Sequence, residues 1–170
     1  MPVTVTKDNV KNVLAAIKRL TDTEILIGIP RDSPHDAGPG QSGEPITSAE
    51  LGYIHEFGAP EANIPPRPFL ISGVQNAIDD KGLIDKLKKT AQTALSGDLA
   101  KINAQMDAIG QIAEDAVKQK LADGPFLPLA PRTIAARVAR GVTRTDPLID
   151  TGAMRQAVTH VIAKKGARNA

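Results

Sequence analysis

The fold is decided by residues 99–121, which read LAKINAQMDAIGQIAEDAVKQKL. Apolar residues recur in this stretch at near-heptad spacing, which predicts a long helix with one continuous apolar face. They are Leu99, Ile102, Met106, Ile109, Ala113, Val117 and Leu121. A second apolar helix is predicted from Phe69 to about Leu95, with a kink or break at Gly82. Because residues 96–98 (Ser-Gly-Asp) suit a tight turn that caps the next helix, the two helices are expected to form a long αα-hairpin.

Two short β-rich runs lie outside this hairpin, at opposite ends of the chain. Residues 24–29 read EILIGI and residues 157–163 read AVTHVIA, and we expect them to pair. A helix capped by Thr6 is predicted before the first run, with Val10, Val13, Leu14 and Ile17 as its apolar stripe. The sequence therefore predicts an α+β fold in one domain over residues 1–170. Its core would be a small antiparallel sheet flanked by helices, with the long αα-hairpin packed beside it.

The segments between these elements are rich in turn and cap signals. Residues 30–47 contain four prolines and are expected to form a loop without a core of its own, mobile in the free protein. Residues 48–58 predict a short helix capped by Thr47 or Ser48 and ended by Gly58. The three prolines of residues 63–68 predict an extended path, with Pro68 in the first turn of the helix that follows.

Composition and charge exclude several classes of function. The chain has no cysteine, which excludes disulfides, thiolate metal ligands and a cysteine nucleophile. No apolar run approaches the length of about 20 residues that a membrane-spanning helix needs, and the N-terminus lacks the pattern of a signal peptide. Residues 125–170 carry eight basic and two acidic side chains, a net charge of +6. This basic part would face either an acidic neighbouring subunit or nucleic acid.

No constellation of residues predicts catalysis. His55-Glu56 is half of a zinc-protease motif, but Ala59 stands where the second histidine should be. No serine lies in a Gly-x-Ser-x-Gly elbow, and no phosphate-binding glycine loop is present. His160, on the second β-run, is expected to be a half-buried or surface residue. We therefore predict that the chain is not an enzyme and binds neither a metal nor a cofactor.

Two segments carry recognisable motifs. The first runs Tyr53-Ile54-His55-Glu56-Phe57-Gly58 and continues at Ile64-Pro65-Pro66-Arg67-Pro68-Phe69-Leu70. It resembles a signature of phage neck and tail-completion proteins, in which an EFG turn precedes IPxRPFL. The second begins at Pro128-Leu129-Ala130-Pro131-Arg132-Thr133 and ends with Pro147-Leu148-Ile149-Asp150-Thr151-Gly152-Ala153-Met154-Arg155. It is similar to a pattern of phage virion-morphogenesis proteins, from which Met154 departs by replacing a leucine.

The resemblance implies a structural virion protein of a tailed bacteriophage. Such a protein joins head and tail at the neck, or completes and terminates the tail, by forming a ring on the tube or connector. Its partners would be copies of itself, in a ring expected to be hexameric, and neighbouring neck, connector and tail-tube proteins, with DNA passing through the channel. It would be assembled in the cytoplasm of the host bacterium and reside in the virion, without a membrane. The interaction candidates are Tyr53, His55, Glu56, Phe57, Gly58, Pro66, Arg67, Pro68, Phe69, Leu148, Asp150, Thr151, Gly152 and Arg155.

Several of these residues have an expected structural role. Phe57 is expected to anchor the short helix, and Gly58 to turn the chain. Arg67, held between prolines, would pair with an acidic residue, either Glu56 of its own chain or one in a neighbouring subunit. Residues 150–152 would form a helix cap, by Asp150 or Thr151, and a close backbone approach at the glycine.

Two alternatives to this function stay open. The chain could be an assembly factor that is absent from the finished particle. It could also be a nonspecific DNA-binding protein that uses its basic C-terminal part, with Arg137, Arg140 and Arg144 as phosphate contacts.

Overall fold

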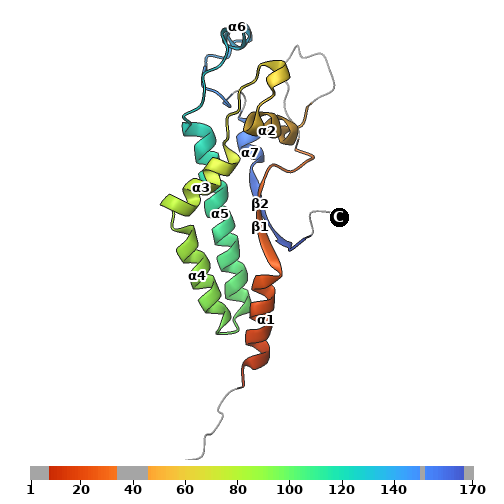
Figure 1. Cartoon of the computed structure of the whole chain (residues 1–170), viewed down its shortest axis with the longest axis vertical. Coiled ribbons are helices and arrows are strands. Elements are labelled where there is room, and N and C mark those ends of the chain that lie inside the picture. Colours follow the sequence, from red (N-terminus) through yellow and green to blue (C-terminus); the bar gives the residue numbers. More distant parts are fainter. Residues whose placement is uncertain (1–7, 34–45, 150–151, 167–170) are drawn as a thin grey trace, which may run out of the picture.

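Helix α5 (Leu99–Asp123) forms the axis of the computed structural model, and the other elements are arranged around it (Figure 1). The structure describes residues 8–33, 46–149 and 152–166. In chain order, the other elements are α1 (Val10–Thr21), β1 (Thr23–Gly28), α2 (Ser48–Phe57), the 3-10 turn η1 (Pro60–Ala62), α3 (Leu70–Asp80), α4 (Leu83–Ala94), α6 (Pro131–Ala139), α7 (Ala153–Ala157) and β2 (Thr159–Lys164).

The predicted αα-hairpin is present, with its first arm divided into two helices. Both α3 and α4 pack against α5. They are separated at Gly82, whose φ of +64° places it in the left-handed region that glycine enters without strain. At the turn of the hairpin, the Asp98 carboxylate accepts a hydrogen bond from the Lys101 amide at 2.9 Å. The break at Gly82 and the cap at Asp98 are therefore as predicted.

The packing of α3 on α5 depends on one close approach. A Cβ atom added at Gly73 would lie 2.7 Å from the Cα of Val117, nearer than real Cβ contacts come. Glycine at this position therefore lets the two helix backbones touch and buries Val117 completely.

The predicted sheet is also present, as an antiparallel pair of β1 and β2. Ile25 pairs with Ile162, and Ile27 pairs with His160. Side chains of a strand alternate between its two faces, and α5 covers the face that carries these four residues. The α+β architecture predicted from the sequence is thus confirmed.

The core consists of three apolar clusters that follow one another along α5. Each cluster joins buried residues of α5 to a different set of neighbours. The first contains Ala16, Ala94, Ile102 and Met106; the second contains Ala77, Leu83, Ile109, Ala113 and Ala116; the third contains Phe69, Val117, Leu121, Leu148, Met154 and Val158. The spacing of apolar residues on α5 therefore fixes where α1, α3, α4, α7 and the two strands pack.

Helix α1 differs from its prediction in its start and in its buried face. It begins at Val10 after the N-cap residue Asn9, and the Asp8 carboxylate accepts the Val10 amide at 3.0 Å. Thr6 lies outside the described residues and too far before Val10 to be the N-cap, so that prediction is wrong. The core contact comes from Ala16 and Leu20. The predicted stripe was also wrong in part, because Val10, Leu14 and Ile17 are exposed.

Two further cap predictions are corrected by the structure. The N-cap of α3 is Phe69, so Pro68 precedes the helix and is not in its first turn. The N-cap of α7 is Gly152, at a φ of +84°. Because glycine has no side chain, the predicted side-chain cap by Asp150 or Thr151 is not at the N-cap position. Asp150 and Thr151 lie outside the described residues, as does most of the loop predicted at 30–47.

Candidate functional site

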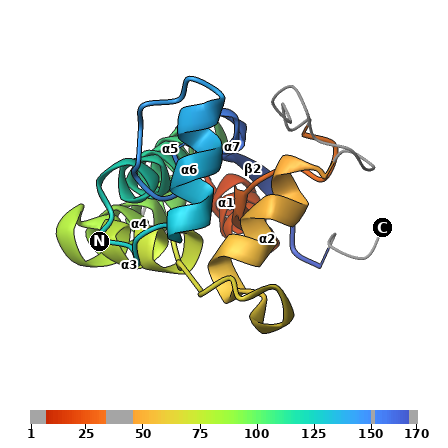
Figure 2. The same ribbon diagram turned by 90° about the horizontal axis from the view of Figure 1, so that it is seen from above.

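The two motif segments, far apart in the sequence, meet at the end of the molecule that carries α2, α6 and α7. We call this the motif end (Figure 2). Phe69 from the first segment and Leu148 from the second belong to the same buried cluster. Helix α2 also packs on α7. The described motif residues therefore form one continuous unit, which the sequence alone did not place together.

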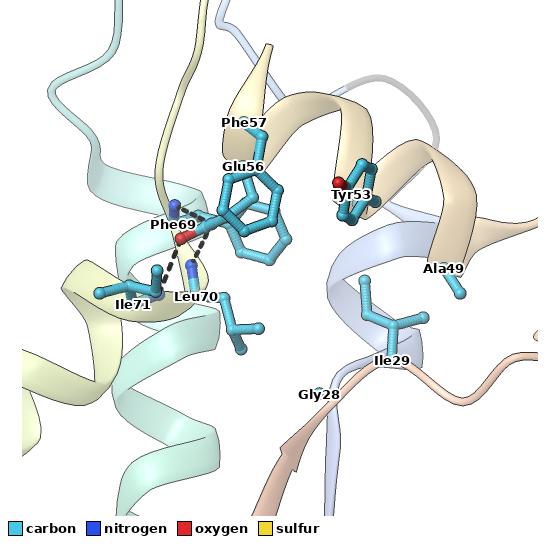
Figure 3. Close-up of a pocket in the computed structure, with 10 residues that line it drawn as sticks. Gly28, Ile29, Ala49, Tyr53, Glu56, Phe57, Phe69, Leu70 and Ile71 are labelled. Carbon is cyan, nitrogen blue, oxygen red and sulfur yellow. Dashed lines mark hydrogen bonds between the residues drawn. The ribbon is translucent and has the colours of Figure 1, made fainter.

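Glu56 organises the centre of the motif end. It is 6% exposed, and its two carboxylate oxygens accept hydrogen bonds from three successive backbone amides at the start of α3. Its Oε2 atom accepts from Phe69 N and Leu70 N, both at 2.8 Å, and Oε1 accepts from Ile71 N at 3.0 Å (Figure 3). The first amides of a helix have no partner within the helix, and they attract negative charge. Glu56 thus caps α3 from the neighbouring helix α2.

Gly58 turns the chain between α2 and the proline segment, as predicted. Its φ of +79° belongs to the left-handed region, and its amide donates to the Ile54 carbonyl at 2.7 Å. A Cβ atom at this position would lie 2.9 Å from both Ile64 O and Pro66 N. Glycine is therefore required here by the backbone conformation and by the space available.

Arg67 connects the first motif segment to the second. Its Nε donates to the Leu127 carbonyl at 2.9 Å, and its guanidinium donates to the Pro128 carbonyl at 3.1 Å. Burial lowers the pKa of Arg67 from its ordinary value, and the positive charge of Arg137 lowers it further. Glu56, the partner predicted within the chain, caps α3 instead and does not hold Arg67, which is only 5% exposed. A guanidinium presents several donors in one plane, which suits two adjacent carbonyls.

Arg137 plays the same part in the second motif segment. Its Nη1 donates to the carbonyls of Arg144, Asp146 and Ile149 at 3.2, 2.9 and 3.0 Å. The side chain is 6% exposed, so it is not available as the phosphate contact that the DNA-binding alternative required. From the sequence alone Arg137 belongs to a basic surface, because no local pattern indicates that its partners are carbonyls of the loop that follows it.

Leu148 lies in the loop that Arg137 holds. It has a φ of +64°, which is uncommon for a residue with a side chain, and it is 9% exposed. Its side chain packs in the cluster of Phe69, Met154 and Val158. Burial of the leucine side chain therefore offsets the strain of its backbone.

Tyr53 and Phe57 are the exposed members of the first motif. They are 67% and 57% exposed, and their ring centroids lie 4.8 Å apart. The prediction that Phe57 anchors α2 is wrong, because the buried anchor is Glu56. The two rings stand beside a hollow of about 270 Å³ between α2, the start of α3 and the end of β1 (Figure 3). We call this hollow the aromatic groove; it is lined by Gly28, Ile29, Ala49, Gly52, Tyr53, Glu56, Phe57, Phe69, Leu70 and Ile71.

The remaining predicted site residues that the structure describes lie around the motif end. Pro66 and Pro68 are exposed, and His55 is half-buried and lines a second hollow beside α6. Arg155, on α7, donates to the Lys118 carbonyl at 3.2 Å. Gly152 has no close neighbour that a Cβ would meet. Glycine is therefore favoured here by the positive φ and not by the predicted close approach of another backbone.

One cluster of charged residues was not predicted and lies away from the motif end. The Nδ1 atom of His160 is 2.6 Å from Glu114 Oε2, and its Nε2 is 3.3 Å from Asp107 Oδ1. Lys118 donates to the other oxygen of Glu114. The imidazole rests on Gly110, where a Cβ would approach the ring to 2.2 Å. In the sequence, Gly110 lies between Asp107 and Glu114 within one predicted helix. That His160 packs against this glycine is visible only once β2 is placed on α5.

This environment favours the charged forms of both His160 and Glu114. Burial acts against the charge of Glu114, but hydrogen bonds from Lys118 and His160 outweigh it and lower its pKa. Burial likewise acts against the charge of His160, but hydrogen bonds to Glu114 and Asp107 outweigh it and raise its pKa. The charged cluster therefore fastens β2 to α5.

The stabilisation from this cluster should depend on pH. The contribution of His160 is fully present below its ordinary pKa of about 6.5 and is lost as the pH rises through its raised pKa in the folded protein. The contribution of Glu114 is present above its ordinary pKa and is lost as the pH falls through the lowered one. Thermal unfolding should thus show His160→Gln most destabilised, relative to the wild type, between about pH 5 and pH 6.5.

The control for this prediction is the titration of His160 itself. Its ring proton signals, assigned by their absence in His160→Gln, should shift at a higher pH than those of an unperturbed histidine. A difference in unfolding temperature between wild type and variant that stays constant from pH 5 to pH 9 would contradict the expected linkage.

None of the described residues form a group of three His, Asp or Glu side chains that could hold a metal ion. Among the same residues, no helix has the length and apolar character that crossing a membrane requires. Comparison with protein-family models, with curated proteins and with solved structures gave no match in any of the three.

Proposed function

We propose that this chain is a structural virion protein of a tailed bacteriophage. It joins head and tail at the neck, or completes and terminates the tail, by forming a ring on the tube or connector. The proposal rests on the resemblance of residues 53–70 and 128–155 to motifs of such proteins.

The single observation that best supports the proposal is the union of these two segments at the motif end. Arg67 and Glu56, the charged residues of the first motif, are buried and hydrogen-bonded to backbone groups. Residues used in this way fix the path of the chain, because they hold backbone amides and carbonyls of separate segments in place. Motif residues that fix the path of the chain in this way agree with a structural role.

The exposed groups of the motif end agree with a role in assembly. Tyr53 and Phe57 project from α2 on a rigid support, and aromatic residues are enriched where protein interfaces gain most of their binding energy. These two are half of the aromatic residues of the chain. Their exposure beside an apolar hollow favours contact with another protein.

Electron microscopy of particles made without this gene tests the proposal. Full heads beside separate tails are expected if the protein joins the two, and tails of irregular or excessive length if it terminates the tail. Supplying the wild-type gene in trans should restore intact particles. Normal, infectious virions in its absence would contradict the proposal.

A further inference from the structure

A buried arginine of the motif end has no counter-ion in the described part of the chain. Arg67 is 5% exposed, and no ion pair joins it to an acidic residue among those that the structure describes. The neighbouring charge that acts on it, from Arg137, is also positive. Burial of a charge is costly unless an opposite charge offsets it. The folded chain therefore holds a positive charge that a bound anion would neutralise.

Part of the Arg67 guanidinium also lacks a hydrogen-bond acceptor. Its Nε and Nη2 atoms, which form one edge of the planar group, donate to the carbonyls of Leu127 and Pro128. A guanidinium has five N–H donors, and none of the described residues accepts from Nη1. Nη1 and the second hydrogen of Nη2 form another edge, whose geometry matches the two oxygens of a carboxylate. A carboxylate on this edge would supply both the missing acceptors and the missing charge.

The second hollow of the motif end, beside α6, is where an anion would meet this arginine. The hollow has a volume of about 310 Å³, and we call it the arginine hollow. Arg132, exposed in the first turn of α6, also lines it and donates to the Ala62 carbonyl at 3.5 Å. None of the described residues that line the hollow is acidic. Its polar lining residues are His55, Asn63, Arg67, Arg132 and Thr133.

Helix α6 adds to the positive character of the arginine hollow, because the helix begins there. Its N-cap residue, Ala130, lines the hollow and makes no side-chain hydrogen bond, and the first turn of α6 contains no acidic residue. The start of a helix carries a partial positive charge that favours anions. The buried Arg67, the exposed Arg132 and the start of α6 therefore act on an anion in the same direction.

The shape and lining of the arginine hollow favour an acidic side chain over a phosphate of DNA. Half of its lining residues are apolar, among them Ile64 and Leu129, which suits the CH₂ groups of a glutamate. Arg67 is recessed, whereas the phosphates of a duplex lie on a convex surface and are best reached by exposed side chains. Two exposed arginines further along the chain, Arg140 and Arg144, do not line the hollow.

We propose that the arginine hollow is a carboxylate-binding site, which receives an acidic side chain of a neighbouring protein subunit. The carboxylate accepts hydrogen bonds from the free edge of Arg67, and Arg132 adds a second positive charge at the surface. The charge of Arg67 is thus neutralised only on assembly. The inference deepens the proposed function and rests on it for naming the neighbour as a virion subunit.

Titration of the full chain with a small carboxylate tests the site. The probe is N-acetylglutamate N-methylamide, and its neutral match is N-acetylglutamine N-methylamide. Binding is followed by NMR through the Nε–Hε signal of Arg67, which is assigned by its absence in Arg67→Lys. We expect this signal to move saturably with the glutamate probe, with an affinity roughly tenfold higher than that of the glutamine probe, because only the former carries a charge.

Two exposed arginines provide matched variants that leave the buried Arg67 in place. Arg132→Gln removes a positive charge from the lining of the hollow, and Arg144→Gln removes one that does not line it. We expect Arg132→Gln to weaken binding of the glutamate probe by roughly two- to fivefold, the range of an exposed charge pair. Binding to Arg144→Gln should equal that of the wild type.

Three results would overturn the carboxylate site. They are an Arg67 signal that does not move with the glutamate probe, equal affinity for both probes, and equal weakening by the two variants. A signal that moves with inorganic phosphate and not with the glutamate probe would also overturn it and would favour nucleic acid as the partner. Each of these results leaves the proposed function standing, whereas normal virions without the gene would remove that function and leave the binding of the probe intact.

Discussion

Replacing Glu56 by glutamine is expected to lower the free energy of unfolding by about 3 kcal/mol. The carboxylate accepts three amide hydrogen bonds at the start of α3. Glutamine keeps the shape but loses the charge, and it turns an NH₂ group toward amides that need an acceptor. In a chain of this size, the loss should lower the unfolding temperature by roughly 6–12 °C, measured by calorimetry or circular dichroism.

Glu61→Gln is the matched control for Glu56→Gln. Glu61 is an exposed residue of η1, so the same chemical change should alter the free energy of unfolding by no more than about 0.5 kcal/mol. Equal unfolding temperatures for the two variants would mean that Glu56 does not hold the start of α3.

Replacing Leu148 by alanine is expected to cost about 3 kcal/mol of stability. The substitution leaves a cavity between Phe69, Met154 and Val158. The positive φ of residue 148 remains in the variant, and alanine is strained at this φ just as leucine is. Chemical denaturation should therefore show a lower midpoint with an unchanged slope.

Two further variants separate the cavity from the backbone strain at Leu148. Leu127→Ala makes the same change at a position that is 57% exposed, and it should be nearly neutral. Leu148→Gly enlarges the cavity but removes the strain, so it should be at least as stable as Leu148→Ala, the reverse of the usual order for these residues. A glycine variant that is clearly less stable than the alanine variant would refute the left-handed conformation.

The features that could be predicted well from the sequence are those determined by residues within a single helix, cap or turn. The apolar spacing of α5, the turn at Gly97 and the cap at Asp98 are local patterns, and they gave the hairpin correctly. The capping box of Thr47 and Glu50 is also local, since the two residues satisfy each other's backbone and side-chain groups within one turn. Such features could be predicted because they need no knowledge of tertiary packing.

The features that could not be predicted depend on contacts between distant residues. Glu56 lies on α2 but caps α3, which begins only after the proline segment. Arg67 donates to carbonyls at the start of the second motif. The sequence gives the residue type in each case but not its partner. The buried face of α1 was predicted wrongly for a related reason. The apolar residues of a helix show how wide a face could be buried, but they do not show which part of that face packs against the core. The motif residues stay interaction candidates, and their hydrogen-bond partners are visible only in the structure.

The aromatic groove also has an optical consequence. The chain has one tyrosine and no tryptophan, so its near-ultraviolet fluorescence comes chiefly from Tyr53. That ring stands at the rim of the groove, 67% exposed and against Phe57. Any molecule that enters the groove will dehydrate the ring and slow its rotation. The emission intensity and anisotropy of the unmodified protein can therefore follow occupancy of this surface in real time, with no attached dye.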